Sequence, residues 1–67
     1  MSALSRHHRK CKSNGGSNSS RNISIVPVVQ HQAWHTLFQD FSPEKIAQII
    51  SEVWCDPDYV FIAKRRV

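Results

Sequence analysis

One stretch of sequence decides the fold, residues 5–36: SRHHRKCKSNGGSNSSRNISIVPVVQHQAWHT. In its middle, residues 12–21 are almost all Ser, Asn and Gly, and the Asn-Gly-Gly sequence within them is typical of a turn because Gly accepts a positive φ. The β-branched run over 23–29 then favours a strand. A short strand opening near Ala3 would precede the loop, so this order predicts a β-hairpin with a polar loop.

A helix is predicted directly after the hairpin. Pro27 ends the second strand or confines it to a sheet edge, because it has no amide donor. From residue 29 to 40 the spacing of apolar residues becomes helical. The expected apolar face carries Ala33, Trp34, Leu37 and Phe38. His31 and His35 are four residues apart, so a helix presents them on one side, one turn apart.

The C-terminal part predicts a second helix over residues 43–54. Ser42 serves as N-cap, Pro43 takes the first helical position and Glu44 adds an acid to the first turn. The apolar stripe of this helix consists of Ile46, Ile49, Ile50, Val53 and Trp54. The sequence Asp-Pro-Asp then stops the helix, and residues 59–63 are typical of a short strand. The elements together indicate an α+β fold.

Length and charge limit the function. A chain of 67 residues is too short for two domains, and a domain of this size buries only about 60% of its unfolded surface. Such a domain usually needs a metal, disulfides or a partner for stability. The formal net charge is +4, and residues 1–39 contain no acid. The bases of that segment are Arg6, Arg9, Lys10, Lys12 and Arg21. They predict attraction to phosphate or acidic partners, with a solvated basic arm as the alternative.

The sequence gives no sign of a membrane. No apolar run approaches the roughly 18 residues of a membrane-spanning helix. The N-terminus is basic, but no apolar segment typical of a secretory signal follows it. We therefore expect a cytoplasmic protein.

The most informative pattern is formed by four histidines and one asparagine. His7 and His8 are adjacent, Asn22 follows His8 after 14 positions, His31 follows after 9 more, and His35 after another 4. A strand, a polar loop, a second strand and a helix would bring these side chains together. Adjacent strand residues point to opposite faces, so His7 and His8 are expected to have different roles.

This pattern resembles the HNH endonucleases, the ββα-metal or His-Me finger group, and most of all the DNase domains of nuclease colicins. Those proteins have a His-His or Asp-His pair, a Gly-rich loop, an Asn ahead of a short apolar strand, and a His on the next helix; the colicin branch adds a His one turn further. This chain supplies His7-His8, Asn14-Gly15-Gly16, Asn22 before the strand, and His31 and His35. The resemblance covers about half of the chain.

The resemblance implies a single HNH-like domain over residues 1–67. Its ββα-metal finger would occupy 1–39, and a supporting helix and short C-terminal strand would occupy 40–67. His7, His31 and His35 resemble the ligands of one divalent metal ion. His8 resembles the general base, and Asn22 resembles the residue whose amide bonds across the loop and fixes the His8 ring. Zinc, nickel, magnesium and manganese all remain open as the metal.

The implied activity is metal-dependent hydrolysis of DNA phosphodiester bonds, with RNA still open as a partner. A near-neutral imidazole can deprotonate the attacking water, and the metal polarises the phosphate. Arg6, Arg9, Lys10, Lys12 and Arg21 are the candidate phosphate contacts. One alternative is a catalytically inactive, metal-stabilised nucleic-acid-binding module, and another is a basic interaction protein that binds no metal. The stripe of helix 43–54 could also form a homodimer face.

Overall fold

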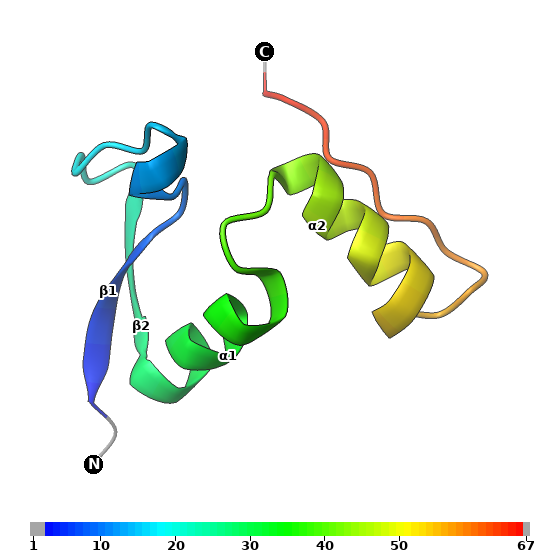
Figure 1. The fold of residues 1–67 in the computed structure, drawn as a ribbon, viewed down its shortest axis with the longest axis horizontal. Helices are drawn as coiled ribbons and strands as arrows, with labels where there is room; N and C mark the ends of the chain where they lie inside the picture. The colour runs from blue at the N-terminus through cyan, green and yellow to red at the C-terminus, as the bar shows by residue number, and fades with distance from the viewer. Residues whose placement is uncertain (1–2, 67) are drawn as a thin grey trace.

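A computed structural model describes residues 3–66, which form a two-stranded antiparallel sheet, two helices and an extended tail (Figure 1). The elements are β1 (Leu4–His8), a 3₁₀ turn (Lys12–Asn14), β2 (Ile23–Pro27), α1 (Val28–Phe38), α2 (Pro43–Ile49) and a π-helical turn (Ile50–Trp54). The predicted α+β class is confirmed. Residues 1, 2 and 67, which the predicted domain includes, lie outside the described part.

The hairpin is antiparallel, and its register places His8 opposite Ile23 and Leu4 opposite Pro27. Pro27 is therefore the last residue of β2, where its missing amide interrupts no further pair of the ladder. Helix α1 begins at the next residue, so the strand predicted over 23–29 is two residues shorter. One face of the hairpin lies on α1, while Leu4 and Ile25 on the other face remain 64% and 60% exposed.

The loop between the strands depends on its two glycines. Gly15 has φ of 89°, a left-handed conformation that glycine adopts without steric cost. Gly16 passes so close to the backbone of Lys10 that an added Cβ would collide with the carbonyl oxygen of Lys10. Both positions therefore require glycine, which gives the polar loop a defined shape.

The core lies where α1 meets the hairpin and is very small. Among residues 3–66, Phe38 alone is buried, at 7% exposure, and its ring packs on Trp34 with centroids 4.8 Å apart. The predicted apolar face is therefore only half right, because Ala33 and Leu37 are exposed. The hairpin covers the side of α1 that carries His31 and Trp34, and this orientation turns Ala33 and Leu37 outward.

Helix α2 begins as predicted. The Ser42 hydroxyl accepts a hydrogen bond from the Lys45 amide at 3.2 Å, and Pro43 takes the first position. The helix continues to Trp54, but its last five residues form a π turn, which ends with the Cys55 amide donating to the Ile50 carbonyl at 2.9 Å. A π turn changes the angular spacing of side chains. Val53 and Trp54, expected on the buried stripe, are consequently 68% and 60% exposed.

The strand predicted at residues 59–63 is wrong. The described tail runs extended beside α2 and the π turn, and it pairs with no strand (Figure 1). Its link to the helix is the amide of Phe61, which donates to the Ser51 hydroxyl at 2.7 Å. The physical reason is the neighbour: a helix uses its backbone groups internally and offers no ladder to an extended segment.

The helices are also short. Helix α1 has 11 residues, and α2 has seven before its π turn. A helix needs about 20 predominantly apolar residues to span a bilayer. Within the described range, no helix has both the length and the apolar character for a membrane crossing.

Candidate metal centre and adjoining loop

Three histidines from the hairpin and from α1 meet at the centre of the ββα unit. His7 lies on β1, and His31 and His35 lie one turn apart on α1. Each ring offers a nitrogen, and these three atoms all lie within 4.8 Å of one another. The Nε2 atoms of His31 and His35 are 2.9 Å apart, and the His7 ring stands edge-on to both. The structure therefore brings together all three predicted ligands, close enough to hold a metal ion.

The orientation of His31 is fixed by a serine that the sequence analysis did not identify. The Oγ of Ser5 lies 2.7 Å from Nδ1 of His31 and 3.4 Å from the carbonyl oxygen of Val26. If Nδ1 carries the proton and donates to Ser5, the serine donates onward to Val26 and leaves Nε2 of His31 with its lone pair. That nitrogen is the one facing His35. Such outer hydrogen bonds fix ligating imidazoles in metal sites.

His7 presents a nitrogen that has no partner within the described part of the chain. Its Nδ1 atom is buried and makes no hydrogen bond. Burial, followed by repulsion from His31, His35, His8 and Arg9, lowers the pKa of His7 below 6.5. A buried imidazole nitrogen without a hydrogen bond lowers the stability of the folded state unless a ligand such as a metal ion binds to it. A neutral imidazole is also the form that binds metals.

The spacing of the nitrogens fits a tetrahedral ion. Zinc–nitrogen bonds of about 2.0–2.1 Å place two ligand nitrogens about 3.4 Å apart at the tetrahedral angle. The observed 2.9 Å pair and the 4.8 Å limit of the cluster lie on either side of that value, so small side-chain rotations suffice.

Trp34 connects this cluster to the core. Its ring lies edge-on to His7, with centroids 5.8 Å apart, and packs on Phe38 from the other side. The histidine cluster and the buried residue of α1 are thus linked through the ring of Trp34.

His8 lies outside the three-histidine cluster and bonds to the loop. Its Nε2 atom is 2.8 Å from Oδ1 of Asn18. An amide oxygen only accepts hydrogen bonds, so Nε2 carries the proton and Nδ1 keeps a lone pair. The different settings of His7 and His8 agree with the alternation expected for adjacent strand residues.

Asn22 holds the loop rather than the His8 ring. Its Oδ1 accepts from the Lys10 amide at 2.7 Å, and its Nδ2 donates to the carbonyl oxygens of Lys10 and Ser17 at 3.0 and 2.8 Å. The amide therefore crosses the loop, as the resemblance implied, but the side chain that bonds to the His8 ring is Asn18.

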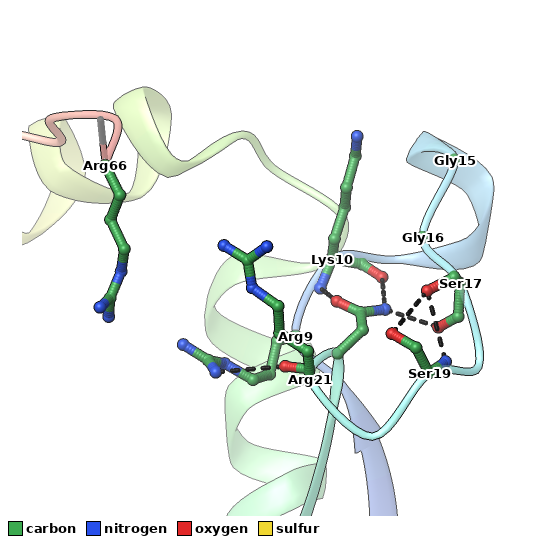
Figure 2. Close-up of a pocket in the computed structure, with 9 residues that line it drawn as sticks. Arg9, Lys10, Gly15, Gly16, Ser17, Ser19, Arg21 and Arg66 are labelled. Carbon is green, nitrogen blue, oxygen red and sulfur yellow. Dashed lines mark hydrogen bonds between the residues drawn. The ribbon is translucent and has the colours of Figure 1, made fainter.

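The predicted basic residues divide into two groups. Arg9, Lys10 and Arg21 line a hollow of about 650 Å³ above the loop, together with Arg66 from the tail (Figure 2). Two other predicted phosphate contacts, Arg6 on β1 and Lys12 on the 3₁₀ turn, are exposed but do not line it.

Two functional candidates, Ser5 and Asn18, were missed from the sequence. Ser5 had a usable signal, because it precedes His7 by two residues and so shares its strand face. Asn18 had none, since it stands in a loop of similar Ser and Asn residues. Arg66 is brought to the loop by the path of the tail, which no local pattern encodes. Comparison with known proteins found no matching family model, no matching curated protein and no matching solved structure.

Proposed function

We propose that this protein is a metal-dependent endonuclease of the HNH type that hydrolyses DNA phosphodiester bonds. The observation that supports it is the convergence of His7, His31 and His35, with ligand nitrogens within 4.8 Å. Next to that cluster in the chain, His8 is held by Asn18 with one ring nitrogen left to accept a proton. Hydrolysis of a phosphodiester needs a metal site and an oriented base, and these histidines supply a candidate for each.

His7, His31 and His35 would hold the ion, which supplies polarisation of the scissile phosphate and stabilisation of the leaving oxygen. Three imidazoles favour zinc or nickel over magnesium, which prefers oxygen ligands. Magnesium and manganese are therefore tested beside zinc and nickel rather than assumed.

The role we assign to His8 is that of general base. Its Nε2 proton is donated to Asn18, which leaves Nδ1 to take the proton from an attacking water. Imidazole changes protonation near neutral pH, which suits it to this task. Asn22 would act indirectly, by holding the backbone of Lys10 two residues after His8.

DNA is the proposed substrate because basic side chains line the loop next to His8. Arg9 and Arg21 extend from it, and residues 1–39 contain no acid that would repel a phosphate. RNA with the same base sequence as the DNA substrate serves as the comparison substrate for cleavage. The cytoplasm stays the expected compartment within this proposal.

The test is nicking of supercoiled plasmid by protein freed of metal and then supplied with zinc, nickel, magnesium or manganese in turn. We expect one or more of these ions to support nicking. His8→Ala should abolish it and leave zinc and DNA binding within about twofold. Gln32→Ala is the matched control, because Gln32 is an exposed residue of α1 beside His31. Nicking by His8→Ala at the parental rate would remove His8 from the role of base.

One observation favours the alternative of an inactive, metal-stabilised nucleic-acid-binding module. Phe38 is the one buried residue of the part that the structure describes, so the fold has little apolar stabilisation of its own. In that case no ion supports cleavage, but each tenfold rise in free metal above the dissociation constant adds about 1.4 kcal/mol to stability. A melting temperature that ignores both metal and chelator would contradict the metal site in either version.

A further inference from the structure

The hollow above the loop is lined by guanidinium groups from three separate parts of the chain. Arg9 follows β1, Arg21 precedes β2, and Arg66 comes from the tail. Figure 2 shows the ends of these three side chains on the same side of the loop, while Lys10 points elsewhere. The path of the tail beside α2 therefore brings a third arginine to the two supplied by the hairpin.

The charges in this hollow are not balanced by the protein. The described residues that line it include no Asp or Glu. One contact uses a guanidinium internally, where Nη1 of Arg9 donates to the carbonyl oxygen of Arg21 at 3.3 Å. Like charges gathered without an acid repel one another, and an anion between them removes that cost.

The walls of the hollow suit a phosphate group. Guanidinium groups bind phosphate oxygens through paired N–H donors. The hydroxyl of Ser19 accepts from Ser17 at 3.0 Å, which leaves its own hydrogen to donate into the hollow. Gly16, Ser17 and Asn22 keep the loop in one shape, which fixes the backbone from which Arg9 and Arg21 extend.

The position of the hollow relates it to the proposed cutting site. Arg9 directly follows His8, and Asn18, which bonds to the His8 ring, stands between two serines that line the hollow. A nucleic-acid strand with one phosphate in the hollow would thus pass beside His8.

We propose that Arg66 completes a phosphate-binding pocket with Arg9 and Arg21, and that this pocket holds the DNA backbone next to the bond being cut. The inference rests on the proposed function for its ligand, but it is a statement about binding and not about cleavage. It assigns a nucleic-acid contact to the C-terminal tail, through Arg66.

The test measures binding of the zinc-loaded full chain to a 20-base-pair DNA duplex by fluorescence anisotropy, from 50 to 200 mM KCl, with the duplex checked for cleavage on a gel. Arg66→Ala should weaken binding at 100 mM KCl about tenfold and lower the slope of log K against log[salt] by about 0.9, the loss of one phosphate contact. Arg66→Lys should keep the slope and lose about threefold in affinity, because it keeps the charge but not the paired donors.

Arg65→Ala is the matched control, with the same loss of charge one residue away. Arg65 lines the neighbouring hollow between α2 and the finger, which shares Arg9 with the pocket but also contains Asp40 and Glu44. Because these acids offset its charge, substitution of Arg65 should change affinity by less than twofold and leave the slope unchanged. Equal effects of Arg65→Ala and Arg66→Ala would overturn the pocket and leave a diffuse basic tail.

The two proposals fail separately. A chain that binds the duplex through Arg66 but nicks plasmid with none of the four metals keeps the pocket and loses the nuclease. A chain that nicks plasmid with no dependence of binding on Arg66 keeps the nuclease and loses the pocket. A chain that binds no DNA overturns both.

Discussion

Two hydrogen bonds decide how the histidines of this protein can act. Ser5 takes one nitrogen of His31 and so directs the other toward His35, while Asn18 takes one nitrogen of His8 and leaves the other free to accept a proton. An imidazole with one nitrogen fixed has one defined tautomer and one defined orientation. Two small polar neighbours, Ser5 and Asn18, thus orient the rings of His31 and His8.

The Asn18 bond leads to a prediction about the pH dependence of nicking. Asn18→Ala removes the acceptor, so we expect kcat to fall about tenfold with zinc affinity unchanged. Asn18→Asp keeps an acceptor and adds a carboxylate that favours the imidazolium form, so the pH–rate profile of kcat should move to higher pH. Ser20→Ala, in the same loop, is the control. An Asn18→Asp profile identical to that of the parent would contradict a bond between these residues in solution.

The setting of His7 leads to a second prediction, on stability against pH. Its pKa is lowered by burial and by repulsion from neighbouring cations, so the unfolded chain takes up this proton first as the pH falls. The folded state therefore keeps its full stability above about pH 6.5 and loses it as the pH falls below that value. A bound ion adds to this slope, because ligands must be deprotonated to bind.

Melting temperatures with zinc and with chelator, measured from pH 5.0 to 7.5, test this. We expect the rise in Tm caused by zinc to be full at pH 7.5 and almost absent at pH 5.0. A rise in Tm that is the same at both ends of the range would show that imidazoles are not the ligands.

At the scale of elements, the sequence predicts what depends on local pattern. The loop, the second strand of the hairpin and the start of α2 follow from glycines, a β-branched run and the Ser42-Pro43 cap, and all are present. The expected order of strand, loop, strand and helix also predicted that the histidines would come together. The resemblance to HNH endonucleases implied the set His7, His31 and His35, which meet in one cluster.

What the sequence did not predict depends on packing between elements. Ala33 and Leu37 fit a helical stripe, but the hairpin packs against the neighbouring face of α1, which carries the histidines. Residues 59–63 have strand composition, yet their neighbour is a helix, and a strand needs a ladder partner. Arg66 reaches the loop for the same non-local reason.

The loop gives a prediction at this scale, through its two glycines. Gly16→Ala should destabilise the fold by about 2–4 kcal/mol, because the new Cβ collides with the rigid backbone of Lys10. Gly15→Ala should cost only about 1 kcal/mol, the penalty for a left-handed φ in a residue with open space around it. Urea denaturation of the zinc-loaded variants measures both. Equal losses would mean that the close approach of Gly16 to Lys10 does not persist in solution.

For the whole molecule, size and exposure leave a deficit of stability. Phe38 is the one buried residue in the range 3–66, and Cys11 and Cys55 are free thiols, so no disulfide compensates. A metal that joins β1 to α1 would stabilise the ββα unit. It would do little for α2 and the tail, whose contacts are mainly with each other.

The region formed by α2, the π turn and the tail is predicted to form a homodimer face. Its apolar side chains are largely exposed: Val53 68%, Trp54 60%, Tyr59 67%, Val60 72% and Ile62 79%. An exposed apolar surface on the end of a helix and the adjoining tail is typical of an association face. We expect sedimentation equilibrium to show a monomer–dimer equilibrium between roughly 1 and 100 μM. Val53→Glu should shift this equilibrium to monomer, because an unpaired carboxylate buried in the dimer interface is costly. Gln30→Glu, an exposed residue of α1, adds the same charge outside that face and should leave the equilibrium unchanged. A parent chain that stays monomeric up to the highest concentration would contradict the dimer. It would not bear on the candidate metal site between the hairpin and α1.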